Sequence, residues 1–442
     1  MNEETPNAVA TISLGCPKNL VDSERMLADL AEGGCIVGAE LDEANVVLIN
    51  TCGFLDEARD EALAVIEEVA RLKRAGRIER IVVAGCLPQR EGEGLLSVAP
   101  DIDAIVGVND RSAVLQAVRG EGPTSRLSAY VPGTRPLGDA GRFRLTADHT
   151  AYLRIAEGCS RECSFCTIPA IRGPFRSKHA DDVLAEAAEL TADGAKELNL
   201  IAQDTTAWGG DLGPADTLAS LLRRLDSESG AEWLRLMYTY PMRFTDDLIG
   251  AMAECSRVVP YVDMPLQHIA DGVLQRMRRG ATGSSIRDLL DRVRRRVENI
   301  AIRTTFIVGF PGETDEEFAE LLDFVKDQRF EAMGVFAFSP ENGTPAAEMD
   351  GQLPEDVKAE RLEALMLAQQ EIAFAANEAA IGGERMVLVD GVNEEGICIG
   401  RHAGQAPEVD SVCLLAEPRD AGEMVQSRVA GADGYDLIVQ PV

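Results

Sequence analysis

The chain has 442 residues, with 74 Asp and Glu against 43 Lys and Arg, so its formal charge is −31. At one domain per ~100–200 residues, this length predicts two to four domains, each with its own core. A protein that grips a nucleic-acid backbone unaided needs a basic face that neutralises phosphates. A pI near 4.5 counts against that class and favours basic partners.

The N-terminal residues 1–10 lack the basic start and apolar run of a signal peptide. No stretch approaches the ~18 uninterrupted apolar residues of a membrane span. We therefore expect a cytoplasmic protein with no membrane segment. In a reducing cytosol, ten cysteines are expected to bind metal, act in catalysis or pack in the core, and not to form disulfides.

Three β-branched runs in the first 110 residues each end in a cysteine. They are residues 8–16 (AVATISLGC), 45–52 (NVVLINTC) and 81–86 (IVVAGC), with helical patterns at 22–30 and 56–72 between them. This alternation predicts a doubly wound parallel sheet, in which the site lies at the carboxyl ends of the strands. Cys16, Cys52 and Cys86 are therefore expected to converge at one edge. The alternative is three unrelated buried thiols.

A second alternating pattern follows residues 120–146, which are rich in Gly, Pro, Ser and Arg and predict a linker or an edge excursion. Six strand-like runs separated by helical runs predict a partial (β/α)6 barrel with its chemistry on loops at the strand carboxyl ends. The predicted strands are 152–156, 196–202, 233–238, 259–264, 301–308 and 332–338, and the clearest helices are 181–193, 284–297 and 315–328.

The end of the chain changes character twice. Residues 355–380 carry the apolar spacing of one long helix, and short strand-like runs broken by Gly, Asn and Asp follow Gly382. These runs predict a small β-barrel. We therefore expect an α/β protein with domains at residues 1–140, 145–375 and 376–442.

The segment EGCSRECSFC places Cys159, Cys163 and Cys166 at the spacing CxxxCxxC, directly after the first predicted barrel strand. Three thiolates on one short loop can hold three corners of a 4Fe-4S cluster and leave one iron open to an external ligand. A zinc knuckle would need a second Cys or Cys/His pair, and the nearest histidines do not match ligand spacing. The motif therefore favours an iron–sulfur cluster over zinc or incidental cysteines.

This motif at the end of the first strand of a six-unit βα barrel resembles the radical S-adenosylmethionine (SAM) superfamily. The resemblance implies that SAM binds the open iron and is reduced by one electron to yield a 5′-deoxyadenosyl radical. It also implies that Phe165 lies near the adenine, and that Ile307 and Gly309 in FIVGFPGET approach the nucleoside. The Gly-Gly-Glu usual after the second strand is replaced here by IAQDTT, so Gln203 and Asp204 are the expected contacts to the methionine end.

Together with LGCPKN, NTCGF and AGC upstream and a small β-domain downstream, the chain resembles the methylthiotransferases over essentially its whole length. The resemblance implies that Cys16, Cys52 and Cys86 hold a second, auxiliary 4Fe-4S cluster that delivers sulfur, and that the tail is a TRAM domain. Replacing a C–H bond by C–S needs a radical to remove hydrogen and a sulfur held nearby, which explains two clusters. One SAM serves as radical source and another as methyl donor, and a reductant protein is implied.

Two branches of this family differ in substrate: one modifies a tRNA adenosine near the anticodon, the other the β-carbon of an aspartate in ribosomal protein S-twelve. Residues 376–442 contain twelve acids, four arginines and no lysine, which suits a basic ribosomal protein and does not suit phosphates. PYVDMPLQHIADGVLQRMRRG and APEVDS also resemble the ribosomal branch. We therefore expect the ribosomal protein as substrate, with no direct nucleic-acid binding.

Two points stay open at this stage. His268 is a candidate substrate contact, with a purely structural histidine as the alternative. A non-catalytic iron–sulfur protein, for redox sensing or electron transfer, is the competing function class. Cys35, Cys255, Cys398 and Cys413 lack partners at ligand spacing, and we interpret them as packing residues.

Overall fold

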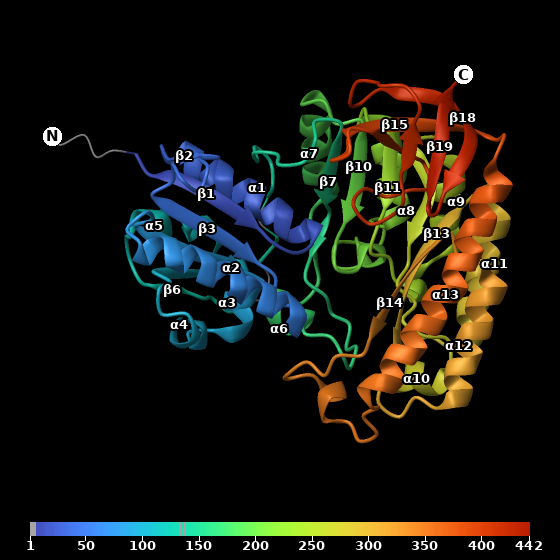
Figure 1. Cartoon of the computed structure of the whole chain (residues 1–442), viewed down its shortest axis with the longest axis horizontal. Helices are drawn as coiled ribbons and strands as arrows, with labels where there is room; N and C mark the ends of the chain where they lie inside the picture. Colours follow the sequence, from blue (N-terminus) through green and yellow to red (C-terminus); the bar gives the residue numbers. More distant parts are fainter. Residues whose placement is uncertain (1–5, 132–133, 137) are drawn as a thin grey trace. The chain divides into compact units, whose positions relative to one another are not determined.

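The computed structural model describes residues 6–131, 134–136 and 138–442, which form two compact units (Figure 1). The first unit comprises Met1–Leu145, Ala156–Arg161 and Cys166–Lys178. The second comprises Thr146–Ile155, Glu162–Phe165 and His179–Val442. The predicted three-domain division is finer, and its boundaries stay a prediction.

The first unit contains a six-stranded parallel sheet in the order β2-β1-β3-β4-β5-β6. This confirms the doubly wound sheet predicted from the three runs that end in cysteine. Its strands are β1 (Ala8–Ser13), β2 (Ile36–Val37), β3 (Val46–Thr51), β4 (Arg80–Gly85), β5 (Ala104–Gly107) and β6 (Ser125–Arg126). Its helices are α1 (Pro17–Glu32), α2 (Asp56–Arg74), α3 (Cys86–Glu91), α4 (Gly94–Val98), α5 (Val114–Arg119) and α6 (Ile168–Arg172).

Both faces of this sheet are covered because alternate residues of each strand point to opposite faces. In β3, Val47 and Ile49 pack with α2, α3 and α4, whereas Val46 and Leu48 pack with α1 and α5. Burying each such side chain contributes about 1.5–3 kcal/mol. The result is a rigid sheet whose strand ends are held in register.

The segment predicted as a linker or an edge excursion, residues 120–146, contains the edge strand β6. Arg142, later in the segment, makes a buried ion pair with Glu24 of α1 (Nε–Oε2 2.9 Å). Further along the chain, a short antiparallel pair joins β8 (Ala156–Glu157) to β9 (Arg176–Ser177). This pair brackets the predicted radical SAM loop.

The second unit contains a six-stranded sheet in the order β14-β13-β12-β11-β10-β7, with every neighbouring pair parallel. The order is that of an open barrel, as predicted. The strands are β7 (Thr150–Arg154), β10 (Glu197–Ile201), β11 (Trp233–Leu236), β12 (Val258–Asp263), β13 (Ala301–Val308) and β14 (Ala332–Ala337).

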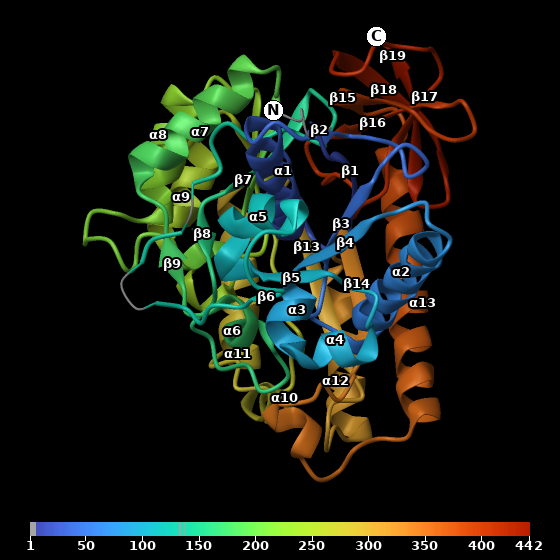
Figure 2. The same cartoon turned by 90° about the vertical axis from the view of Figure 1, so that its left-hand side faces the viewer.

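The helices of this barrel lie along the outer side of the strands, and Figure 2 shows α7, α8 and α9 there. Several of these helices begin at a threonine that caps the first turn. The Thr314 hydroxyl oxygen, for example, accepts from the Glu317 backbone N–H, and the Glu317 carboxylate accepts from the Thr314 backbone N–H. The helices are α7 (Ala180–Ala192), α8 (Leu218–Glu228), α9 (Asp246–Glu254), α10 (Asp271–Arg276), α11 (Gly283–Arg296) and α12 (Asp315–Gln328).

The long predicted helix is α13 (Glu355–Ala380), and a closed five-stranded barrel follows it. The strand order β15-β16-β17-β19-β18 confirms the predicted small β-barrel. The strands are β15 (Glu384–Val392), β16 (Cys398–His402), β17 (Cys413–Leu415), β18 (Met424–Asp433) and β19 (Asp436–Pro441). Cys398 and Cys413 pack inside this barrel, in line with their interpretation as packing residues.

Buried charges join the small barrel to the six-stranded one. Glu197 of β10 lies between Arg235 of β11 (Nη2–Oε1 2.8 Å) and Arg401 of β16 (Nη1–Oε2 2.8 Å), and all three side chains are almost fully buried. Burial alone would raise the pKa of Glu197, but the two guanidinium groups hold it below its usual range. The carboxylate therefore compensates two buried cations at once.

Glu197→Ala is expected to destabilise the second unit by about 3–5 kcal/mol, because it leaves Arg235 buried without its carboxylate partner and Arg401 with Asp390 alone. The contribution of the carboxylate is present above the pKa of an unfolded glutamate and is lost as the pH falls through the lowered pKa. The measurement is the urea midpoint of unfolding. Glu384→Ala is the control, because Glu384 forms an exposed pair with Arg428 and its loss should leave the midpoint in place. Equal midpoints for the two variants would contradict the prediction.

Candidate functional site

The three cysteines of the first unit lie at the carboxyl ends of three adjacent strands. Cys52 directly follows β3 and Cys86 directly follows β4, whose last residues, Thr51 and Gly85, are paired in register. Cys16 follows β1 after two residues and caps the N-terminus of α1. The structure thus brings together the three thiols that the sequence placed at one sheet edge. They are close enough that Cys16 raises the pKa of Cys52, and that Cys16 and Cys52 both raise the pKa of Cys86.

Glycines beside these cysteines let the loops approach closely. A Cβ on Gly15 would lie 2.7 Å from the Cys52 Cβ, and the φ of Gly15 is +91°. A Cβ on Gly53 would lie 2.8–3.0 Å from the backbone of Cys86 and Leu87. Backbone contacts this close leave no room for a side chain, so the cysteine loops are packed against one another.

Buried amides fasten the strand ends to α1. Asn19 donates through Nδ2 to the carbonyl oxygens of Leu14 and Thr51, both at 2.9 Å. Asn50 donates to the Asn19 carbonyl oxygen (2.7 Å) and to Ser23 Oγ (2.8 Å). Since these bonds satisfy polar groups that burial would otherwise leave unpaired, they hold the loops that carry Cys16 and Cys52 in one arrangement.

The three thiols differ in their electrostatic surroundings. Burial raises the pKa of Cys86 to about 12 and also raises that of Cys52. Burial acts in the same direction on Cys16, but Lys18, Arg172 and the N–H groups at the start of α1 lower its pKa below the usual value. Cys16 is therefore the thiol that most readily becomes a thiolate, and ligation by iron would deprotonate the other two.

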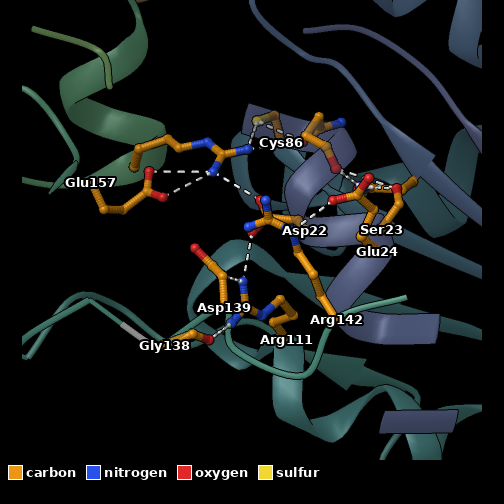
Figure 3. Close-up of polar contacts among 12 residues, drawn as sticks. Asp22, Ser23, Glu24, Cys86, Arg111, Gly138, Asp139, Arg142 and Glu157 are labelled. Carbon is orange, nitrogen blue, oxygen red and sulfur yellow. Dashed lines mark hydrogen bonds and ion pairs between the residues drawn. The ribbon is translucent and has the colours of Figure 1, made fainter. Parts of the chain in front are cut away.

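A chain of buried ion pairs reaches Cys86 through Arg172 (Figure 3). Asp22 of α1 accepts from Arg172 (Nη1–Oδ2 2.9 Å) and from Arg111 (Nη1–Oδ1 3.0 Å). Arg111 also contacts Asp139 at 2.9 Å, and Lys178 contacts the other oxygen of that carboxylate at 2.7 Å. Alternating charges therefore connect α1 to the segments that flank the radical SAM motif.

The radical SAM cysteines belong to both units. Cys159 is buried in the first unit, where its N–H donates to the Gly173 carbonyl oxygen (3.0 Å). Cys166 also belongs to the first unit. Cys163 belongs to the second unit, where its sulfur lies 3.7 Å from Nη1 of the buried Arg279. An arginine beside a ligand sulfur suits a thiolate held on a cluster.

The residues predicted near the nucleoside gather around one apolar cluster in the second unit. Phe165 lies edge-on to Phe310, with ring centroids 6.4 Å apart, and Ile307 packs against the same cluster. Gly309 has a φ of +71°, and a Cβ there would lie 2.3 Å from Lys358 Cγ. Only glycine fits at that close approach to α13.

The remaining predicted contacts are placed as follows. Gln203 and Asp204 follow β10, and Asp204 Oδ1 accepts from Thr206 Oγ1 at 2.7 Å. His268 is fully buried: its Nδ1 accepts from the Ala270 N–H (3.1 Å), and its Nε2 lies 3.7 Å from Glu313. These contacts are those of a structural histidine, and a substrate contact by His268 stays a prediction.

Sequence reasoning missed Arg172 and Arg279, buried arginines whose side chains each contact a cysteine sulfur. Arginine seldom lies fully buried without a charged partner, but a sequence does not indicate which of many arginines is buried. The nearest signal was position, because Arg172 ends the helix that follows the CxxxCxxC motif.

The donor set fits iron–sulfur clusters better than a single ion. Within residues 6–131, 134–136 and 138–442, no three His, Cys, Asp or Glu side chains form a site for one metal ion. A 4Fe-4S cluster is bound at separate corners by thiolates, so its ligands stand further apart than those of one ion. Three thiols on glycine-packed loops at one sheet edge fit such a cluster.

Comparison with protein families matches three regions. Residues 8–107 match uncharacterized protein family UPF0004, residues 153–325 match the radical SAM superfamily, and residues 381–442 match the TRAM domain. Ribosomal protein uS12 methylthiotransferase RimO from Geobacter sulfurreducens is 43% identical over 435 residues, which cover 97% of each chain. The chain belongs to the RimO family. It is therefore a radical SAM methylthiotransferase, and 4Fe-4S clusters and SAM, predicted above, are the cofactors of this family.

Further relatives and solved structures agree with this membership. RimO of Anaeromyxobacter sp. (strain K) is 45% identical and covers 96% of this chain and 91% of its own. The structure of the radical SAM methyltransferase TsrM from Kitasatospora setae, solved with cobalamin and a 4Fe-4S cluster, has a TM-score of 0.56. It is 17% identical and covers 77% of each chain, so it supports the α/β fold alone.

Gly15→Ala is expected to remove the iron of one cluster, because its Cβ would strike Cys52 where the cysteine loops meet. Iron in anaerobically reconstituted protein should fall from about eight to about four per chain. Gly34→Ala is the matched control, because Gly34 has a similar φ of +81° but nothing within 4 Å of the added Cβ. Full iron content in the Gly15 variant would refute the close-packed site.

Proposed function

We propose that this protein replaces a C–H bond at the β-carbon of an aspartate in ribosomal protein uS12, the S-twelve protein of the small subunit, by C–SCH3. The observation that carries the proposal is the convergence of Cys16, Cys52 and Cys86 at the end of three parallel strands, in a chain that also has the CxxxCxxC motif. The substrate is the one in the names of its full-length relatives. A tRNA adenosine, the alternative, is not favoured by these relatives.

The cofactors divide between two sets of residues. Cys159, Cys163 and Cys166 would hold the radical SAM cluster, and Cys16, Cys52 and Cys86 the auxiliary cluster. When bound, these clusters and SAM supply the radical that removes hydrogen and the sulfur and methyl group that replace it. Phe165, Ile307, Gly309, Gln203 and Asp204 would orient SAM. Asp204 and Gly309 are buried and the other three are half-buried, so they would limit the access of water to the reacting groups.

The auxiliary site is preorganised by the protein. Asn19 and Asn50 hold the loops at the ends of β1 and β3, and the glycine contacts keep the Cys52 and Cys86 loops together. Sites built on strand ends and supported by buried hydrogen bonds keep their geometry better than sites on free loops. The chain would thus hold the sulfur source at a fixed place.

The TRAM domain would recruit the basic substrate. Nine of the twelve acids in residues 376–442 are exposed. In the described structure, two of these nine pair with an arginine: Glu384 with Arg428 and Glu417 with Arg419. Acidic loops between β15 and β16 and between β17 and β18 would attract lysines and arginines of uS12. The basic helix α11 is partly neutralised within the second unit, because Arg292 pairs with Asp288 and Asp246, and Arg294 with Glu331.

A reductant protein would supply the electron for SAM cleavage, and we place the enzyme in the cytoplasm, where uS12 is available free or in the small subunit. In the described residues, no helix has both the length and the apolar character of a membrane span.

Mass spectrometry after incubation with SAM, sulfide and a reductant should find that uS12 gains a methylthio group at one aspartate, whereas unmodified tRNA gains none. A methylthio group on tRNA and not on uS12 would overturn the proposed substrate.

The recruiting role of the tail has its own readout in the same assay. Neutralising four exposed tail acids should raise the KM for uS12 and weaken its dependence on ionic strength, with kcat unchanged. The changed residues are Glu394, Glu395, Asp420 and Glu423, and the matched control neutralises the exposed acids Asp60, Glu61, Glu68 and Glu79 of the first unit. Equal effects of the two sets would count against the tail.

The two cysteine sets are expected to separate in function. Cys159→Ala should abolish both cleavage of SAM to 5′-deoxyadenosine and modification of uS12, because the cluster loses one of its three cysteine ligands. Cys52→Ala should still cleave SAM but fail to thiolate. The measurement is 5′-deoxyadenosine by chromatography beside the mass of uS12. Normal thiolation by the Cys52 variant would contradict the role of Cys52 in the auxiliary cluster. Absence of SAM cleavage by the wild-type protein would favour a non-catalytic iron–sulfur protein.

A further inference from the structure

The side chain of Arg172 reaches one of the three strand-end cysteines. Its exposed fraction is 2%, and its Nη2 lies 3.2 Å from the Cys86 sulfur and 2.8 Å from Asn19 Oδ1. A guanidinium at this distance donates a charge-assisted hydrogen bond once the sulfur is a thiolate. The contact lies within the first unit, which contains both residues.

Two carboxylates fix the direction of this guanidinium. Nη1 of Arg172 lies 2.9 Å from Asp22 Oδ2 and 3.2 Å from Glu157 Oε1, so the opposite edge of the planar group faces Cys86. Asp22 is itself held by Arg111 on its other oxygen. The Arg172 fork is therefore oriented before any cluster is bound.

The short helix that carries Arg172 is fastened at both ends to the cysteine loops. Thr167, directly after Cys166, donates to the Phe54 carbonyl oxygen (3.3 Å), two residues beyond Cys52. Arg172, at the other end of α6, contacts Cys86. The segment that leaves the radical SAM motif is thus pinned to the loops of two of the three strand-end cysteines.

We propose that Arg172 is a positioning residue for the auxiliary cluster: it holds the Cys86 sulfur by a charge-assisted hydrogen bond and sets the reduction potential of the cluster bound there. This inference rests on the proposed auxiliary site at Cys16, Cys52 and Cys86. Hydrogen bonds to ligand sulfurs and nearby charge are among the factors that set cluster potentials. A fixed positive charge favours the reduced, more negative cluster, so it raises the potential.

A merely structural Arg172 would act only by compensating Asp22 and Glu157. Arg111 provides the comparison, because it is also buried and also pairs with Asp22. Within the described residues, its side chain contacts Asp22, Asp139 and Gly138 and no cysteine sulfur. Loss of either arginine leaves Asp22 short of one partner. Only loss of Arg172 should change the cluster itself.

The test uses the full-length chain with Cys159, Cys163 and Cys166 replaced by alanine, so that only the auxiliary cluster loads. Arg172→Gln, Arg172→Lys and Arg111→Gln are compared in this background. Iron content is measured first, and the midpoint potential is then measured by redox titration followed by electron paramagnetic resonance. With about four irons bound, we expect a more negative potential for Arg172→Gln, a smaller shift for Arg172→Lys, and the parent potential for Arg111→Gln.

Each further outcome decides the matter. An Arg172→Gln protein with full iron and the parent potential overturns the proposal, as does an equal shift in Arg111→Gln. If Arg172→Gln binds no iron, Arg172→Lys decides by its potential. If both Arg172 variants lose iron while Arg111→Gln keeps it, the role in holding the cluster is supported; if all three lose it, the role is structural and the proposal fails.

Failure of the proposed auxiliary site would give a different result from failure of the role of Arg172. If the parent chain with Cys159, Cys163 and Cys166 replaced binds no iron at all, the auxiliary site itself is wrong and the role of Arg172 falls with it. If the parent binds about four irons and the variants do not differ, the auxiliary site stands and only the role of Arg172 is lost.

Discussion

Hydrogen bonding between the parallel strands β1, β3 and β4 is the constraint on which the candidate site depends. Because the three strands run in the same direction and in register, the residues that follow them meet at one edge, however distant they are in the chain. Cys16, Cys52 and Cys86 need no long flexible loop to come together. Their positions are fixed by a sheet that apolar side chains bury on both faces.

Buried ion pairs are the second constraint on the candidate site. Asp22 connects α1 to two arginines from later segments, and one of these reaches Cys86. Buried pairs of this kind contribute little net stability compared with apolar packing, but removing one partner is strongly destabilising. Their value here lies in specifying a single arrangement for the segment that leaves the radical SAM motif.

Much of this molecule could be predicted from sequence where local signals are strong. Strand β13 and helices α12 and α13 have the predicted bounds, because Gly, Pro and Thr punctuate clear apolar periods around them. The strand-like runs predicted after Gly382 are residues 385–391, 395–401, 410–416 and 434–442. They do not include strand β18, since its Ala, Gly, Ser and Gln give no apolar run. The contact between Arg172 and Asp22 spans 150 residues and depends on tertiary packing, which no local pattern encodes.

The buried link from Arg401 to Glu197 also bears on how such enzymes can be rebuilt. The TRAM domain is not independent of the six-stranded barrel, because one of its arginines completes the charge balance inside that barrel. A chimera that carries the tail of a tRNA-modifying relative must bring a cation to this place, or Glu197 loses its ion pair with Arg401. The same tail thus affects both the choice of substrate and the stability of the six-stranded barrel, so the two cannot be redesigned independently.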